Sequence, residues 1–194
     1  TVIPSTARNL NAFQRVRLNF NSHAVINYGG VILNPDGVAN STWLSKKQAE
    51  MHLAVTGLEE IMRHIDDYAS RTGFEGRARL IEDFSTPFYV VLKDPKKDPE
   101  KLAEFETEVV QAWLATEGNA FYLHRNGNNL AVLPKTLNKA HAVQYLQNAL
   151  KAEHGDILSF GMGDSKSDAA FMASCDYAII PRATQLAALA LETL

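Results

Sequence analysis

Apolar residues recur at helical spacing through the middle of the chain. Between Lys46 and Arg71 they stand three or four positions apart, at Met51, Ala54, Val55, Leu58, Ile61, Met62, Ile65, Tyr68 and Ala69. This spacing predicts an amphipathic helix with one buried face. Thr72-Gly73 follows as a helix-ending signal, so we expect one long helix over residues 46–71.

Short apolar runs typical of strands follow this helix, at residues 79–84, 88–92, 121–124 and 130–133. Between the second and third runs, Asp98 and Pro99 suit the N-cap and first position of another helix. The apolar face of that helix is Leu102, Phe105, Val109 and Trp113. Arg125-Asn-Gly-Asn-Asn129 is a hairpin signal between the last two runs. The middle of the chain is therefore predicted as helix, two strands, helix, two strands.

The amino-terminal part is predicted to alternate short elements. We expect a helix followed by a turn over residues 12–20, a strand over 24–26 and a further strand ending at 33. Asn34-Pro-Asp-Gly37 follows as a strong turn signal. Together with the carboxyl-terminal pattern below, this predicts an α/β fold.

Composition narrows the class of protein. The chain has 194 residues, of which 46% are hydrophobic and 21% charged, as in ordinary globular domains. A net charge of −3 gives no support to a nucleic-acid or membrane-surface partner. No apolar run approaches the roughly 18 residues of a membrane helix, and no signal peptide is visible. The single Cys175 excludes an internal disulfide and suits the reducing cytoplasm.

Candidate chemistry gathers in Phe160-Gly-Met-Gly-Asp-Ser-Lys-Ser-Asp168. It follows an apolar run at 156–160 that predicts a buried parallel strand and precedes a short helix expected over 169–173. Open α/β sheets bind ligands at the carboxyl ends of their strands, where Asp164 and Asp168 would lie. Carboxylates suit Mg²⁺, and Lys139 upstream can supply a charge for a phosphoryl group. An ordinary turn with a helix N-cap is the alternative interpretation of these residues.

Three motifs in order resemble those of the haloacid dehalogenase-like (HAD) phosphohydrolases. Val2-Ile-Pro-Ser-Thr-Ala-Arg8 resembles their second motif, Leu137-Asn-Lys-Ala-His-Ala-Val143 their third, and the segment ending at Asp168 their fourth. Residues 175–181 look like the next core strand. At Tyr28-Gly29 the chain departs from an Asn-Gly pair common in the family.

The resemblance implies a Rossmann-like parallel sheet core formed by residues 1–33 and 134–194. An α/β cap at 34–133 would be inserted in it, as in the sucrose-phosphatase-like and Cof-like branch. The implied function is Mg²⁺-dependent hydrolysis of a phosphate monoester, with a sugar phosphate or similar small phosphorylated metabolite as substrate.

The same resemblance implies roles for individual residues. Thr6 would hydrogen-bond the transferring phosphoryl group, and Lys139 would neutralise it and hold the nucleophile. Asp164 would bind Mg²⁺, and Asp168 would orient a metal-bound water or brace Lys139, with Ser165 assisting. In the cap, Arg125, with Asn126 and Asn128 beside it, is a candidate to contact the substrate.

The first motif of the family, a strand ending in Asp-x-Asp that supplies the nucleophile, is not found in the sequence. The chain begins at Thr1 without a methionine. We therefore expect upstream residues in the natural protein, whose strand would lie between those ending at Thr6 and Gly161. The chain as written is expected to lack phosphatase activity. A phosphomutase of the same superfamily and a non-catalytic phosphometabolite-binding domain are the alternatives.

Overall fold

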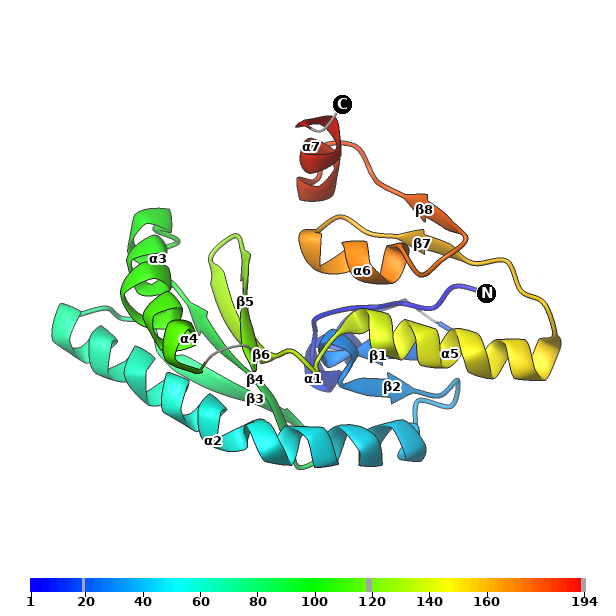
Figure 1. The fold of residues 1–194 in the computed structure, drawn as a ribbon, viewed down its shortest axis with the longest axis horizontal. Helices are drawn as coiled ribbons and strands as arrows, with labels where there is room; N and C mark the ends of the chain where they lie inside the picture. The colour runs from blue at the N-terminus through cyan, green and yellow to red at the C-terminus, as the bar shows by residue number, and fades with distance from the viewer. Residues whose placement is uncertain (19, 118–119, 193–194) are drawn as a thin grey trace. The chain divides into compact units, whose positions relative to one another are not determined.

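The protein is represented by a computed structural model that describes residues 1–18, 20–117 and 120–192, without the side chains of residues 117, 126, 191 and 192. The chain forms two compact units, drawn in Figure 1. Unit 1 comprises Thr1–Leu44 and Asn138–Leu194, and unit 2 is Ser45–Leu137. The first boundary falls inside helix α2, Ser41–Thr72, which begins five residues before the apolar spacing predicts. The sequence predicts boundaries at 33/34 and 133/134. The two units of the structure divide later in the chain, at 44/45 and 137/138.

The first half of unit 1 is built around a small sheet. Strand β1 (Ala24–Ile26) pairs antiparallel with β2 (Val31–Leu33) across a short 3₁₀ turn, η1 (Asn27–Gly29). On its other side β1 forms a parallel bridge with Ser5, supported by a 2.9 Å bond from the amide of Thr6 to the carbonyl of Val25. The expected strand at 24–26 and the turn at 34–37 are both present.

Helix α1 spans Leu10–Gln14 and a turn follows it, so the helix and turn expected over residues 12–20 are present but begin earlier in the chain; residue 19 lies outside the described residues. The Asn9 side chain accepts a 3.0 Å hydrogen bond from the amide of Ala12 and so fixes the helix start two residues earlier than expected. No residue of α1 is buried, so no core packing stabilises a longer helix.

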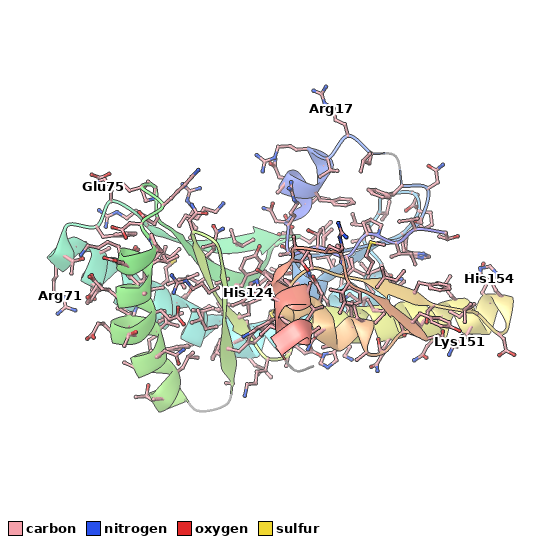
Figure 2. The ribbon with its side chains drawn as sticks, turned by 90° about the horizontal axis from the view of Figure 1, so that it is seen from above. Arg17, Arg71, Glu75, His124, Lys151 and His154 are labelled. Atoms are coloured by element: carbon pink, nitrogen blue, oxygen red, sulfur yellow. The ribbon has the colours of Figure 1, made fainter. Side chains whose placement is uncertain are left out.

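The second half of unit 1 begins with α5 (Lys139–His154), which carries Lys151 and His154 in its last turn (Figure 2). Strand β7 (Phe160–Met162) pairs in parallel with β8 (Tyr177–Ile179). Between them lie the 3₁₀ turn η3 (Lys166–Asp168) and helix α6 (Ala169–Met172), and α7 (Gln185–Glu192) follows β8. The α/β class is confirmed, although the described strands of unit 1 form two separate pieces and not one continuous parallel sheet.

Unit 1 has a compact apolar core beneath β1 and β2. Val25, Ile32, Trp43, Ala142 and Leu146 are buried together. The rings of Trp43 and Tyr145 lie 5.0 Å apart, so α5 and the start of α2 pack on the same strands. This packing fixes the position of the first turn of α5.

Unit 2 contains a four-stranded antiparallel sheet in the order β3-β4-β6-β5. Its strands are β3 (Ala78–Asp83), β4 (Thr86–Lys93), β5 (Phe121–Asn126) and β6 (Asn129–Pro134). Each lies within a few residues of a run predicted from the sequence. The β5–β6 hairpin closes between Asn126 and Asn129, as the Asn-Gly signal indicates.

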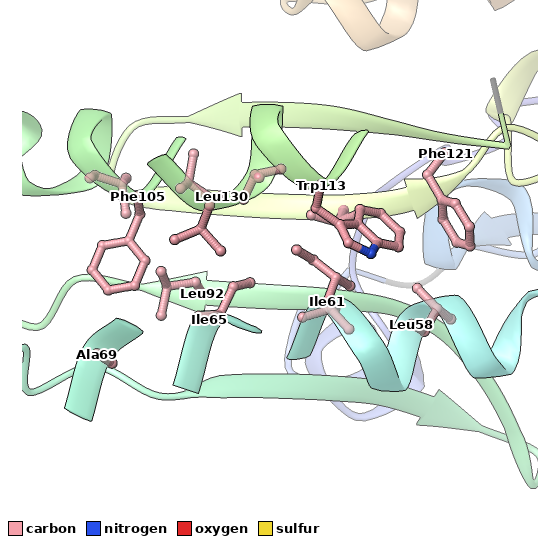
Figure 3. Packing of buried hydrophobic residues seen from close by; sticks show 14 residues of the cluster. Leu58, Ile61, Ile65, Ala69, Leu92, Phe105, Trp113, Phe121 and Leu130 are labelled. Atoms are coloured by element: carbon pink, nitrogen blue, oxygen red, sulfur yellow. The ribbon is translucent and has the colours of Figure 1, made fainter. Parts of the chain in front are cut away.

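Helices α2 and α3 (Pro99–Phe105) cover the sheet of unit 2, together with η2 (Glu106–Gln111) and α4 (Ala112–Glu117). Figure 3 shows their shared core, formed by Leu58, Ile61, Ile65, Ala69, Val90, Leu92, Leu102, Phe105, Val109, Val110, Trp113, Phe121, Leu130 and Val132. Asp98 caps α3 and Pro99 occupies its first turn, as predicted. None of the helices described in either unit has the length and apolarity needed to cross a membrane.

Candidate functional site

A buried ion pair is the centre of the candidate site in unit 1. The Nζ of Lys139 lies 2.7 Å from Oδ1 of Asp168. Lys139 is 7% exposed and Asp168 is 4% exposed. Lys139 is the first residue of α5, and Asn138 caps the helix by accepting a 2.8 Å bond from the amide of Ala140. The N-cap Asn138 and the packing of α5 therefore fix the backbone position of Lys139.

The second oxygen of Asp168 is also fully engaged. Its Oδ2 accepts hydrogen bonds from the Ser165 amide at 3.1 Å, the Ser165 hydroxyl at 2.9 Å and the Asp164 amide at 3.2 Å. Ser165 and Asp168 form a capping box that shapes the turn after β7. Asp168 thus binds Lys139 through Oδ1 and stabilises the turn at residues 164–165 through Oδ2.

These contacts keep Asp168 ionised. Burial alone would raise the pKa of the Asp168 carboxyl, but the charge and hydrogen bond of Lys139 and the hydrogen bonds from Ser165 outweigh it. The pKa therefore lies below its ordinary value. The carboxyl of Asp168 is therefore ionised at neutral pH.

Asp164 differs from Asp168 because its side chain is exposed. Its amide bonds Asp168 and its carbonyl accepts a 3.0 Å bond from Leu186, so the backbone holds the residue while the carboxylate faces solvent. Among the residues that the structure describes, no three His, Cys, Asp or Glu side chains gather as a metal site. One free carboxylate still fits Mg²⁺, which binds few protein oxygens and keeps several waters.

Two glycines, in β7 and directly after it, allow close packing at the start of this loop. A Cβ on Gly163 would lie 2.4 Å from Cβ of Asp168, and one on Gly161 would lie 2.9 Å from Cα of Met172. Both distances are too short for a side chain. Gly161 therefore allows β7 to approach the backbone of α6, and Gly163 leaves room for the side chain of Asp168.

Thr6 lies in the same unit, at the end of the segment that pairs with β1. Its Oγ1 accepts a 3.2 Å bond from the amide of Arg8, and its carbonyl accepts a 3.2 Å bond from the amide of Tyr28. The Tyr28 ring centroid lies 5.9 Å from Nζ of Lys139. Tyr28 therefore bridges the second and third motifs. Sequence reasoning gave it no role, and only its replacement of the usual Asn marked the position.

Arg125 lies in unit 2 and has partners there. Its Nη1 is 3.0 Å from Oε2 of Glu106, and its Nη2 donates a 2.9 Å bond to the carbonyl of Pro99. Asn128 donates a 3.2 Å bond to the carbonyl of Asp94, and the side chain of Asn126 lies outside the described atoms. Arg125 and Asn128 thus support the fold of unit 2 through these contacts.

An apolar groove of about 370 Å³ runs through unit 1. It is lined by residues 1, 3 and 5, by one face of α5, by residues 157–161, and by Phe171 and Cys175. Of the strands that the structure describes, β7 pairs only with β8, while residues 4–6 bond β1. Phe160 and Tyr177 stack at 5.0 Å and are 58% and 55% exposed. Two strand edges therefore border an open apolar space.

The sequence matches a known family over part of its length. Residues 96–190 match the family described as sucrose-6F-phosphate phosphohydrolase, a stretch that contains the third and fourth motifs. No curated protein sequence matches the chain significantly.

Solved structures of related fold cover nearly the whole chain. The sucrose-phosphatase of Synechocystis sp. PCC6803, in complex with sucrose and phosphate, aligns at 19% identity with a TM-score of 0.58, covering 98% of this chain and 73% of that one. The trehalose-6-phosphate phosphatase C-terminal domain of C. albicans aligns at 14% identity with a TM-score of 0.61, covering 89% and 58%. A haloacid dehalogenase-like hydrolase of Bacteroides thetaiotaomicron aligns at 14% identity with a TM-score of 0.53, covering 98% and 85%. The resemblance inferred from the three motifs is confirmed by the fold and by the family match.

Proposed function

Because this chain has the fold of the haloacid dehalogenase-like phosphohydrolases, we propose that it hydrolyses a phosphate monoester of a sugar or similar small metabolite. The observation that carries the proposal is the buried Lys139–Asp168 pair. A buried lysine fixed at a helix start and braced by an ionised carboxylate provides a preorganised positive charge. The match to the sucrose-6F-phosphate phosphohydrolase family supports a sugar phosphate as substrate.

Each side chain of the site has a separate task in this proposal. Lys139 uses one of its three N–H bonds on Asp168 and directs the others to the phosphoryl oxygens. Thr6 accepts a hydrogen bond from Arg8, which leaves its hydroxyl proton free to bond the phosphoryl group. Asp168 holds Lys139, since both of its oxygens are already bonded.

Asp164 is the residue we propose for Mg²⁺. Its carboxylate is exposed beside the pair and its backbone is fixed by Asp168 and Leu186. A bound Mg²⁺ supplies positive charge to the phosphoryl oxygens. The match to Mg²⁺ is one of donor type, because oxygen ligands with several waters are what this ion prefers.

We propose that the nucleophile is an aspartate on a further strand, upstream of the residues in this chain. The apolar groove supports this, because a strand between residues 3–5 and β7 would meet both open edges and cover the apolar lining. The carboxylate would displace the alcohol from phosphorus to form an aspartyl-phosphate, which water then cleaves.

The test is phosphate release by the natural protein, including any residues that precede Thr1, from p-nitrophenyl phosphate and from sugar phosphates. We expect turnover that EDTA abolishes, and no turnover by residues 1–194 alone. Metal-dependent turnover by residues 1–194 would contradict the proposed nucleophile. Phosphoryl transfer between sugar hydroxyls would instead identify a phosphomutase, and binding without turnover a non-catalytic domain.

We further propose that unit 2 is a cap that selects the substrate. The residues of unit 1 described above address only the phosphoryl group, so discrimination between alcohols must come from elsewhere. Exchanging residues 45–137 for the equivalent unit of a phosphatase with another substrate should transfer the ranking of kcat/KM values. An unchanged ranking, with the exchanged protein folded by circular dichroism, would show that selection resides in unit 1.

A further inference from the structure

The turn after β1 has an unusual backbone. Asn27, Tyr28 and Gly29 all have positive φ, at 51°, 54° and 92°. An L-residue in this left-handed region is strained, and a bulky aromatic residue there is rare. Tyr28 is nevertheless buried, with 7% of its surface exposed. Strain of this kind persists only where the surrounding structure imposes it, and it concentrates at functional sites.

Hydrogen bonds and close packing hold this conformation. The amide of Asn27 bonds the carbonyl of Arg8 at 2.8 Å, and the indole of Trp43 bonds the carbonyl of Gly29 at 3.0 Å. A Cβ on Gly29 would lie 2.5 Å from the carbonyl oxygen of Asn138, next to Lys139. The turn is therefore pressed directly against the start of α5.

The consequence of this packing is the placement of one aromatic ring. The amide of Tyr28 bonds Thr6, and its ring centroid lies 5.9 Å from the Lys139 ammonium. This distance is within the range at which an aromatic face attracts a cation. Lys139 therefore has two partners of different kinds, the Asp168 carboxylate at 2.7 Å and the Tyr28 ring.

We propose that Tyr28 is a positioning residue for Lys139. Asp168 accepts one N–H bond of the Lys139 ammonium. The Tyr28 ring restricts the remaining movement of that ammonium, so that its other N–H bonds stay directed to the phosphoryl group. This inference rests on the proposed function of the site. It also gives a physical reason for the strained turn, which brings the ring to the lysine.

The test compares Tyr28→Phe with Tyr28→Leu in the natural protein. Both replacement residues must adopt the same left-handed backbone conformation at position 28, so the two variants carry similar backbone strain. Phenylalanine keeps the aromatic face and leucine removes it. We expect the Kd for inorganic phosphate, measured by calorimetry, to rise about three- to tenfold in Tyr28→Leu and less than about twofold in Tyr28→Phe.

A second measurement does not depend on ligand binding. The aromatic ring should shift the ε-methylene protons of Lys139 upfield in NMR spectra, with assignment by Lys139→Arg. The shift should remain in Tyr28→Phe and disappear in Tyr28→Leu. Equal phosphate affinity in Tyr28→Leu and the unsubstituted protein, or equal loss in both variants, would overturn the inference. A protein that shows the shift but binds no phosphate would count against the proposed function, while the contact with Lys139 would stand.

Discussion

Replacing Lys139 with alanine is expected to lower the phosphatase kcat of the natural protein by about 10²- to 10³-fold. The ammonium is the only positive charge that the structure shows bonded to Asp168, and it is held in a buried, preorganised position. Removing one such group from the charge developing in the transition state has effects of this size. Steady-state kinetics at saturating Mg²⁺ would measure it. Removing one partner of a buried ion pair costs about 3–5 kcal/mol of stability. The protein should still fold, because Asp168 keeps its hydrogen bonds from Ser165 and Asp164.

Lys166→Ala is the matched control. Lys166 lies in the same loop, two residues before Asp168, but is exposed. Its loss should change kcat less than about twofold, since an exposed charge is screened by water. If Lys166→Ala lowered kcat as much as Lys139→Ala, the activity would depend on the general charge of the loop and the role of Lys139 would be wrong.

The sequence was most informative where a local signal and a long apolar pattern agreed. Helix α2 follows the apolar spacing predicted for residues 46–71, and Asp98 with Pro99 begins α3 as expected. The early start of α2 at Ser41 was not visible, because the buried Lys47 separates Trp43 from the apolar residues that begin at Met51.

The helix that follows Pro99 shows what periodicity alone cannot reveal. Its apolar residues predict a regular helix, but residues 106–111 form a wider π-type turn. Val109 and Val110 are then both buried, between Phe105 and Trp113. A π turn depends on how the helix packs on its sheet, so a sequence pattern with fixed period cannot identify it.

The sequence predicted candidate site residues but not the contacts between them. The motif resemblance selected Lys139 and Asp168 and left two roles open for Asp168. The distance of 2.7 Å and the four bonds to its oxygens favour bracing of the lysine. Tyr28 was not identified, because its contact with Lys139 arises from a turn whose backbone conformation no local sequence rule predicts.

Asp168→Asn is expected to destabilise the protein by about 3–5 kcal/mol, the usual cost of removing one partner of a buried ion pair. The Lys139 ammonium would be left buried beside a neutral amide. If the asparagine turned its NH₂ group toward Ser165, two donors would face each other. The hydrogen bond from the Ser165 amide to this side chain would then be lost. Denaturant unfolding at neutral pH, with an unchanged slope, would measure the loss.

Asp164→Asn separates catalysis from stability. Asp164 is exposed, so this substitution should change the free energy of unfolding by less than about 0.5 kcal/mol. Its phosphatase activity should nevertheless fall, and added Mg²⁺ should restore part of it. Equal destabilisation by Asp164→Asn and Asp168→Asn would contradict the distinction between a metal ligand and a brace.

The pH dependence of the Asp168→Asn effect follows from the lowered pKa of Asp168. A carboxyl whose pKa is lower in the folded than in the unfolded protein stabilises the fold fully above its unfolded value, near 3.8. That contribution is lost as the pH falls through the folded pKa, where the carboxylate takes up a proton. The stability difference between the unsubstituted protein and Asp168→Asn should therefore be constant from pH 7 to about pH 5 and shrink in more acidic solution. A difference that grew on acidification would mean that the pKa of Asp168 is raised in the native protein, and that its carboxyl does not form an ion pair with Lys139.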